Sequence, residues 1–120
     1  MGSEGLKRSA SGAGDAVLRG FANLAREELR ACDLLGRWGG EEFLVALPHT
    51  ARADALVPLQ RLLARLAETT LPDWPEGLTV SFSAGITELA VDEAIDLAIE
   101  RADRAMYRAK VSGRRRCELG

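Results

Sequence analysis

The fold is decided by the stretch DLLGRWGGEEFLVALP, residues 33–48. It contains two apolar runs, 34–38 and 43–48, on either side of a short turn that contains glycine. This pattern predicts a β-hairpin, because glycine adopts the backbone conformations that a tight turn between two strands requires. Trp38 comes just before the turn, where we expect its large side chain to anchor the hairpin.

Apolar residues at three- and four-residue steps predict three helices around this hairpin. The first covers residues 15–30, with an aspartate as its cap. The second follows Thr50, a good N-cap, and Pro58 predicts a kink or a late start within it. The third begins at Asp92 and ends before Gly113, which is a natural residue just past a helix end.

A third β-rich run, LTVSFSAGI at residues 78–86, gives the order α-β-β-α-β-α. This order predicts an α+β fold in which helices cover one sheet with antiparallel strands. Residues 1–14, MGSEGLKRSASGAG, are rich in Gly and Ser, so we expect a disordered or linker segment there, or in part a cloning remnant. The folded domain would then cover residues 15–120.

Length and composition limit the classes of protein that the chain can belong to. It has 120 residues, enough for one domain, and 47% are hydrophobic. The 16 Lys and Arg against 18 Asp and Glu lack the basic excess that is typical of DNA- or RNA-binding domains. No apolar run is long enough for a membrane span, nothing resembles a signal peptide, and two cysteines do not make a disulfide framework. We therefore expect a cytoplasmic setting.

The hairpin turn itself carries residues that suit chemistry. Gly39 and Gly40 have no Cβ, so the backbone can lie close to a ligand. Glu41 and Glu42 repel each other unless a cation or a partner neutralises them, and carboxylate oxygens near phosphates suit Mg²⁺. The alternative is a solvated hairpin tip without a ligand. On these residues alone the two interpretations are equally open.

The segment RWGGEEF, residues 37–43, resembles the signature of the GGDEF family, the diguanylate cyclases, in its Gly-Gly-Glu-Glu-Phe form. SAGI at residues 83–86 is similar to a late strand of that family. ADRAMYRAK at 102–110, followed by SGR at 112–114, is similar to its closing helix. The matches occur in the family's order from Gly14 to Arg114. They imply a nucleotide-cyclase-like fold with a ferredoxin-like palm.

The resemblance implies that the chain condenses two GTP molecules into cyclic di-GMP and pyrophosphate, with one GTP held by each subunit of a homodimer. Glu41 and Glu42 would be the catalytic residues and would bind Mg²⁺ or Mn²⁺, and Glu41 would help to deprotonate the attacking 3′-hydroxyl. The residues implied to contact GTP are Gly39 and Gly40 at the phosphates, Asp15 at guanine, and Lys110 and Arg114 at the β- and γ-phosphates. Without the resemblance, Lys110 and Arg114 would be an ordinary basic helix end.

A second motif, Arg-x-x-Asp at Arg30 and Asp33, precedes Gly39 by five residues. This spacing matches the family's inhibitory product-binding site. An arginine can hold a phosphate or the guanine O6 and N7 atoms in a fork, and an aspartate can accept from guanine N–H groups. Arg61 matches an additional arginine that some members use from a neighbouring subunit. The alternative is a surface ion pair worth less than about 1 kcal/mol.

The opening of the family domain has no full match here. Members begin with a strand that carries a metal-binding aspartate, whereas this chain has only Leu6-Lys7-Arg8, which faintly resembles that stretch, and one acid, Glu4, before Asp15. We therefore expect the sheet to lack a central first strand, and the site to lack one metal carboxylate and the asparagine that reads guanine. Such a chain would swap elements with another copy, close its sheet differently or be marginally stable, because unpaired buried backbone groups cost about 1–3 kcal/mol each.

Two functions follow from these motifs, and the resemblance favours the first, with the second as its alternative. The first is a diguanylate cyclase domain whose turnover is severely weakened by the missing aspartate. The second is a binding module that holds cyclic di-GMP through Arg30, Asp33 and Arg61 without making it. A structural fragment with neither property is the third, less specific possibility.

Overall fold

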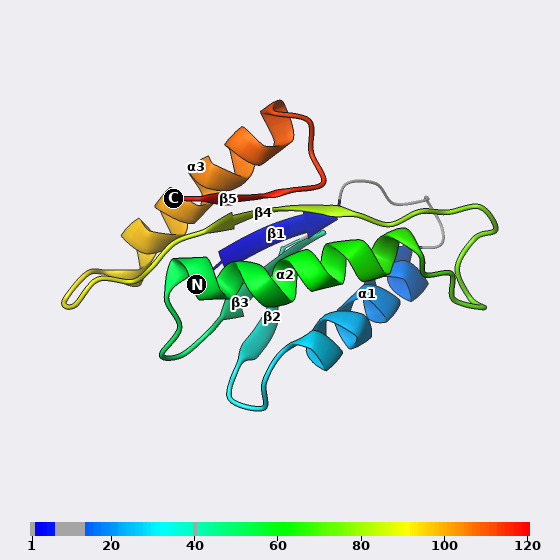
Figure 1. The fold of residues 1–120 in the computed structure, drawn as a ribbon, viewed down its shortest axis with the longest axis horizontal. Coiled ribbons are helices and arrows are strands. Elements are labelled where there is room, and N and C mark those ends of the chain that lie inside the picture. The colour runs from blue at the N-terminus through cyan, green and yellow to red at the C-terminus, as the bar shows by residue number, and fades with distance from the viewer. Residues whose placement is uncertain (1, 7–13, 40) are drawn as a thin grey trace.

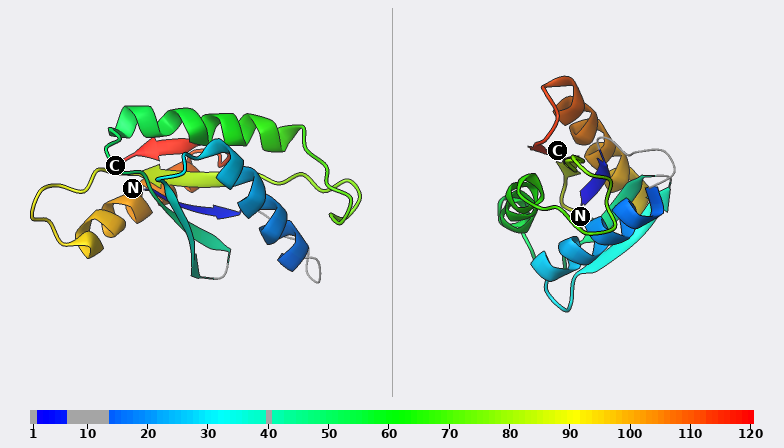
Figure 2. Two further views of the ribbon diagram at one scale, coloured as in Figure 1. Left: turned by 90° about the horizontal axis from the view of Figure 1, so that it is seen from below. Right: turned by 90° about the vertical axis from the view of Figure 1, so that its right-hand side faces the viewer.

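The computed structural model describes the backbone of residues 2–6 and the whole of residues 14–39 and 41–120. These residues form one five-stranded sheet in the order β2-β3-β1-β4-β5 (Figure 1). Helices α1 and α2 cover one face of the sheet and α3 covers the other (Figure 2). In chain order the elements are β1 (Gly2–Leu6), α1 (Gly14–Glu28), β2 (Leu34–Gly39), β3 (Glu42–Ala46), α2 (Arg52–Ala67), β4 (Phe82–Ile86), α3 (Ile95–Val111) and β5 (Cys117–Leu119). The α+β class and the hairpin are confirmed.

Strand β1 lies at the centre of the sheet and corrects the prediction for the N-terminal segment. It pairs antiparallel with β3, where Gly5 faces Glu42, and with β4, where Leu6 faces Phe82. The predictions of a disordered residue 2–6 segment and of a missing central strand are therefore wrong. Composition misled because this strand is held by backbone pairing on both sides rather than by its own β-propensity. Residues 1 and 7–13 lie outside the described part of the chain.

The same strand removes the reason for expecting a domain-swapped oligomer. The gap between β3 and β4 is filled by the chain's own residues 2–6, so no element from a second copy is needed there. A further strand that the sequence did not predict, β5, pairs parallel to β4, with Glu118 opposite Gly85. The basic tail after α3 therefore turns back to the sheet.

The main core lies between the sheet and helices α1 and α2. Phe21 of α1 packs against Phe43 and Phe82, with ring centroids 5.1 and 5.8 Å apart. Because neighbouring residues of a strand point to opposite faces, Phe43 and Phe82 lie on this side of the sheet, and their neighbours Glu42 and Ser83 lie on the opposite side. This alternation determines which hairpin residues face which helices.

Three details of the helix boundaries differ from the predictions. Thr50 does not cap α2; the first backbone N–H, that of Arg52, donates instead to the Glu88 carboxylate at 2.8 Å. Pro58 lies within an uninterrupted α2 rather than delaying its start. Asp92 has a left-handed backbone with φ of 63° and lies in the turn before α3, which begins at residue 95. At the start of α2, a contact from another element thus replaces the local cap.

Helix α3 approaches the sheet very closely at Gly85. A Cβ atom added to this glycine would lie 1.8 Å from the Ala102 carbonyl oxygen and 2.5 Å from the Met106 backbone nitrogen. Most of the buried side chains of α3 are small, and these are Ala98, Ala102, Ala105 and Ala109. The absence of a side chain at Gly85 therefore fixes how near α3 can lie to β4.

We predict that Gly85→Ala lowers the free energy of unfolding by about 3 kcal/mol, because the added methyl group collides with helix backbone that cannot rotate away. Urea denaturation measures the change. Gly36→Ala is the matched control, since a Cβ at Gly36 meets no atom within 4 Å. Equal stabilities for the two variants would contradict the close approach of α3.

Candidate functional site

The hairpin turn is short and distorted in a way that exposes its tip. Gly39 pairs with Glu42, so the turn consists of residues 40 and 41, of which residue 40 lies outside the described part of the chain. A register shift between Arg37 and Gly39 places a β-bulge at Trp38. The Trp38 side chain is 53% exposed and does not anchor the hairpin as predicted, because a bulge turns the extra residue away from the ladder.

Two adjacent carboxylates stand at this turn. Glu41 occupies the turn and Glu42 begins β3, and both are partly exposed. Glu42 pairs with Gly39 on one side and Gly5 on the other, so its backbone is held by two strands. Among the described residues no group of three or more His, Cys, Asp or Glu side chains is placed to hold a metal ion. Two carboxylates fit Mg²⁺, which takes its remaining ligands from water and substrate phosphates.

Gly39 has no packing reason to be glycine. A Cβ atom built on this residue would meet no other atom within 4 Å, and the residue has no left-handed backbone. The space beside Gly39 is therefore open to a ligand.

A cavity of about 520 Å³ lies between α1 and the hairpin. Its lining consists of Asp15, Leu18, Arg19, Ala22, Asn23, Arg26, Leu35, Gly36, Arg37 and Phe43. Asp15, in the first turn of α1, is exposed and lines this cavity. The polar residues Arg19, Asn23 and Arg26 were missed, although their spacing along α1 places them on the same helix face as Asp15.

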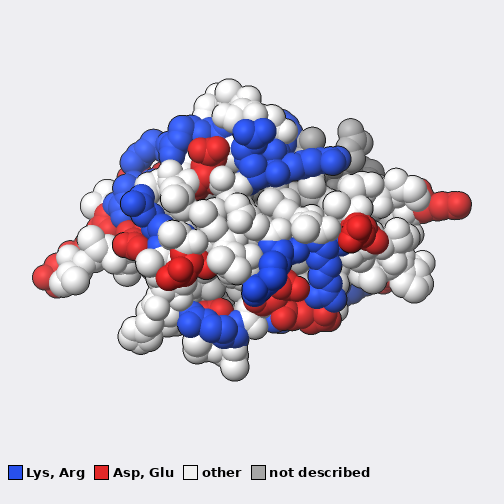
Figure 3. All heavy atoms as spheres, in the orientation of Figure 1, with Lys and Arg blue, Asp and Glu red and all other residues white. Residues whose placement is uncertain are grey.

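Lys110 and Arg114 belong to a different part of the molecule from this cavity. Arg101 of α3 contacts Thr87, and residues 102–106 contact Gly85, so α3 runs antiparallel to β4. Lys110, in the last turn of α3, therefore lies near the beginning of β4, at the same end of the sheet as the hairpin turn. Basic atoms gather over α3 and the segment that joins it to β5 (Figure 3). Arg114 in that segment is exposed and has a left-handed backbone.

The second motif forms a separate site. Arg30, Asp33 and Arg61 line one cavity of about 270 Å³ at the base of the hairpin, beside α2. The remaining lining residues are Glu28, Leu47, His49, Thr50, Asp54, Val57 and Pro58. The structure thus brings together, within one chain, the three residues that the resemblance assigned to a product-binding site.

Arg30 holds this site together through several contacts. Its Nη2 atom lies 2.8 Å from Asp33 Oδ1, 2.9 Å from the Pro48 carbonyl oxygen and 2.7 Å from Thr50 Oγ1. The Asp33 side chain is 2% exposed. Its burial favours a higher pKa, but the hydrogen bonds from the Arg30 side chain and backbone N–H outweigh burial and lower the pKa of Asp33 below its usual value. The pair is therefore charged and joins the α1–β2 turn to the β3–α2 turn.

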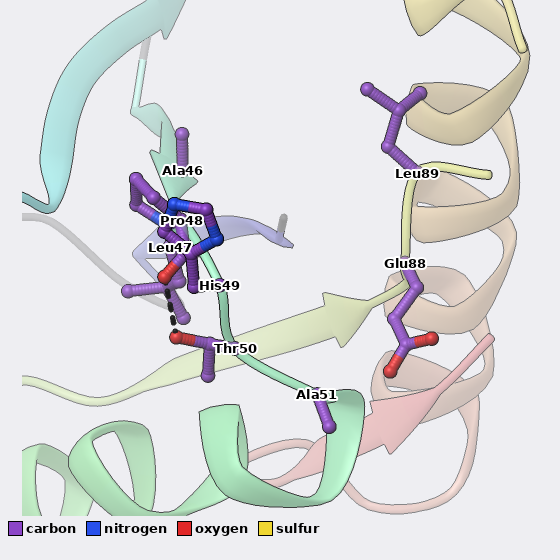
Figure 4. Close-up of a pocket in the computed structure, with 8 residues that line it drawn as sticks. All are labelled: Ala46, Leu47, Pro48, His49, Thr50, Ala51, Glu88 and Leu89. Carbon is purple, nitrogen blue, oxygen red and sulfur yellow. Dashed lines mark hydrogen bonds between the residues drawn. The ribbon is translucent and has the colours of Figure 1, made fainter. Parts of the chain in front are cut away.

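A third cavity, of about 470 Å³, adjoins the second (Figure 4). Residues 46–51 form one wall, where the Thr50 hydroxyl donates to the Pro48 carbonyl oxygen at 3.0 Å, and Glu88 with Leu89 forms the other. The Glu88 wall is fixed by Arg101, which donates to the Glu88 carbonyl oxygen at 2.7 Å and pairs with Glu93. His49, with a φ of 55°, lines both the second and the third cavity.

Comparisons with known proteins agree with the fold and the motifs. The sequence profile of the family described as "Diguanylate cyclase, GGDEF domain" matches residues 11–116. The diguanylate cyclase DgcP of Pseudomonas aeruginosa is 44% identical over 107 residues, which cover 89% of this chain and 16% of the relative. The chain therefore spans about a sixth of the length of that relative.

Solved structures resemble this fold over nearly its whole length. Diguanylate cyclase SiaD of P. aeruginosa, solved in complex with its activator SiaC, gives a TM-score of 0.90 at 35% identity over 99% of this chain and 48% of that chain. A microbial GGDEF domain described by its interaction with bis-(3′,5′)-cyclic di-GMP gives a TM-score of 0.78 at 32% identity, over 99% of this chain and 78% of that chain.

The sheet, its helices and the hairpin define an α+β domain with the nucleotide cyclase fold. The chain belongs to the GGDEF family of diguanylate cyclase domains. The matched sequence begins at residue 11, so the central strand β1 lies before it. Within the described residues no helix is both long and apolar enough to cross a bilayer.

The ion pair between Arg101 and Glu93, beside the Glu88 wall, predicts that the stability of the protein depends on pH. Hydrogen bonds from Arg101 and from the Ala90 N–H lower the pKa of Glu93 from 4.5 to about 2. A lowered folded-state pKa stabilises the protein above the unfolded value, and this contribution is lost as the pH falls from about 4.5 towards 2. We expect Glu93→Gln to be less stable than the parent protein at pH 6 and equally stable near pH 2.

Urea denaturation across this pH range measures the difference. Glu100→Gln, which removes an exposed carboxylate from α3, the helix that carries Arg101, is the control and should show no such trend. A stability difference between Glu93→Gln and the parent that stays constant with pH would contradict the charged pair.

Proposed function

We propose that this domain binds GTP between α1 and the hairpin and, as a homodimer, condenses two GTP molecules into cyclic di-GMP. The observation that carries the proposal is the cavity of about 520 Å³ that has Asp15 in its lining and adjoins the strands of the Glu41–Glu42 turn. Membership of the GGDEF family supports the same reaction. A cytoplasmic setting would supply GTP and keep the two free cysteines reduced.

Asp15 is suited to hold guanine. A carboxylate accepts hydrogen bonds from the N1 and N2 donors of guanine, which adenine does not present in this arrangement. The apolar side chains of Leu18 and Phe43 offer a surface for the base, and both line the cavity with Asp15. The backbone at Gly39, and Gly40 beyond the described residues, would then pass beside the phosphates.

Glu41 is suited to accept the proton of the attacking 3′-hydroxyl. The 3′-oxygen of one GTP forms a bond to the α-phosphorus of the other, the bond to the β-phosphate oxygen breaks, and pyrophosphate leaves. The same step in the opposite direction closes the ring. Because each GTP provides both a nucleophile and an electrophile, two facing subunits complete the reaction.

Glu41 and Glu42 are also the residues that would hold Mg²⁺ or Mn²⁺. When bound, the metal would offset the negative charge that develops on the phosphates. Lys110 and Arg114 would contact the β- and γ-phosphates, because cations at the hairpin end of the sheet offset the charge of the leaving pyrophosphate. Among the described acids, the hairpin pair lacks a third carboxylate, which predicts a low rate of turnover.

The carboxylates are tested by incubating the purified chain with GTP and Mg²⁺ or Mn²⁺ and separating the nucleotides by chromatography. We expect Glu41→Gln to lower the rate of cyclic di-GMP formation about 100-fold or more, because it removes the proton acceptor. Glu42→Gln should raise the metal concentration that gives half of the maximal rate, because it removes a carboxylate ligand.

Glu76→Gln removes an exposed carboxylate from the connection before β4 and is the matched control. It should retain the parent's rate. A folded parent protein that makes no cyclic di-GMP would overturn the catalytic proposal and leave the binding function described next.

A second function is favoured by the cavity that contains Arg30, Asp33 and Arg61. We propose that this cavity binds cyclic di-GMP, either as a product inhibitor or as the ligand of a module without turnover. Arg30 presents a guanidinium fixed by three oxygen partners, and Arg61 presents a second guanidinium on a side chain that is 60% exposed. Fixed guanidinium groups bind phosphate and guanine edges well, because little side-chain freedom is lost on binding.

Calorimetric titration with cyclic di-GMP tests this site. We expect Arg61→Ala and Arg30→Ala each to weaken binding about tenfold or more. Arg30→Ala also leaves the buried Asp33 carboxylate without its partner, so thermal unfolding should accompany that titration. Arg104→Ala, an exposed arginine on α3, is the control.

The same variants separate an inhibited enzyme from a binding module. If the chain makes cyclic di-GMP, Arg30→Ala should accumulate more product than the parent protein. Unchanged affinity in both Arg30→Ala and Arg61→Ala would contradict the site.

A further inference from the structure

A row of ion pairs joins α1 to α2 beside the Arg30 cavity. Arg61 Nε lies 3.0 Å from Glu28 Oε1, and Arg65 Nη1 lies 3.3 Å from Glu28 Oε2. Arg65 also pairs with Glu27 at 2.5 Å. Basic and acidic atoms lie side by side where α1 and α2 meet (Figure 3). One carboxylate, that of Glu28, therefore bridges two arginines.

The two glutamates of this row differ in position. The Glu28 side chain is 18% exposed and lines the cavity, whereas that of Glu27 is 58% exposed and does not line it. Arg61 lines the cavity as well, but its Nε atom donates inward to Glu28. The guanidinium offered to a ligand is thus already neutralised by a carboxylate in the same wall.

The charges of the residues that line the cavity affect how it can bind an anion. Arg30 is neutralised by Asp33, and Arg61 by Glu28, which leaves Asp54 as a further acid in the lining. Cyclic di-GMP carries two negative phosphodiester groups. A phosphate that approaches Arg61 therefore approaches the Glu28 carboxylate too, and like charges a few ångströms apart repel even in water.

We propose that Glu28 competes with the phosphate of the bound dinucleotide for Arg61, so that this carboxylate sets how tightly the cavity binds its anionic ligand. The inference rests on the proposed cyclic di-GMP site. Glu28 is a positioning residue, since it acts through Arg61. Its distinguishing consequence is that removing its charge strengthens binding, whereas the loss of a merely structural contact would weaken it.

Calorimetric titration of Glu28→Gln with cyclic di-GMP tests the proposal. We expect a dissociation constant about three- to tenfold lower than that of the parent protein. The gain should shrink between 0.1 and 1 M salt, because the screening length falls from about 10 to about 3 Å. The double variant Glu28→Gln with Arg61→Ala should bind no more tightly than Arg61→Ala alone, because the arginine for which Glu28 competes is absent.

Glu27→Gln is the matched control. It changes the net charge equally, on the adjacent residue, and contacts Arg65 rather than Arg61. Its affinity should equal that of the parent. An equal gain in Glu27→Gln would show a general charge effect and overturn the proposal, as would unchanged or weaker binding by Glu28→Gln.

Failure of the proposed binding function is distinguishable from failure of this inference. Binding by the parent without a gain in Glu28→Gln sinks the inference alone. If neither the parent protein nor Glu28→Gln binds cyclic di-GMP, the binding function and this inference are both overturned. If Glu28→Gln binds and the parent does not, the competition is supported. Should thermal unfolding show that Glu28→Gln is not folded, Glu28→Asp withdraws the carboxylate by one methylene and should give a smaller gain in the same direction.

Discussion

Backbone hydrogen bonds to β1 join two halves of the sheet that have no direct contact with each other in the strand order. On one side stands the β2–β3 hairpin with Glu41 and Glu42; on the other stand β4, β5 and, packed beneath them, α3 with Lys110. The relative placement of the hairpin carboxylates and the basic end of α3 therefore depends on five residues of central strand. Because β1 pairs along both of its edges, the hairpin and α3 keep their relative positions only when this short strand is in place.

Arg30 makes a second connection of the same kind, this time between turns. Its guanidinium bonds to Asp33 in the α1–β2 turn and to Pro48 and Thr50 in the β3–α2 turn. Both turns flank the hairpin at the end opposite its tip. A ligand in the Arg30 cavity would thus contact the base of the hairpin, whereas a ligand beside Asp15 would contact the middle of the edge strand β2 and Phe43 of β3. One hairpin connects the two cavities.

Sequence patterns predicted the elements whose signal is local. The glycine-containing turn between two apolar runs identified the hairpin, and helical spacing identified all three helices. The pattern failed for Gly2–Leu6, because that strand is specified by partners far along the chain and not by its own residues. It failed at Thr50 for the same reason, since the first N–H of α2 bonds to Glu88, 36 residues away.

In the candidate site, too, the sequence predicted the residues that belong to a motif and missed those that depend on distant partners. Asp15, Arg30, Asp33 and Arg61 were identified by motif, and the structure places them in the two cavities. Glu28 and Thr50 could not be found in this way, because their roles depend on which turn of α2 or of the hairpin lies opposite. Their sequence neighbourhood shows only an ordinary charged helix end and a strand end.

Because the β-bulge in β2 leaves Trp38 exposed, the fluorescence of the two tryptophans reports on different parts of the protein. The bulge turns Trp38 outward beside the hairpin tip, at 53% exposure, whereas Trp74 is 5% exposed and its indole N–H donates to the Ala16 carbonyl oxygen. Indole emission shifts with the polarity of its surroundings, so the blue-shifted component comes from Trp74 and follows unfolding. The red-shifted, quencher-accessible component comes from Trp38, so a change in the surroundings of the hairpin tip can be observed without a label.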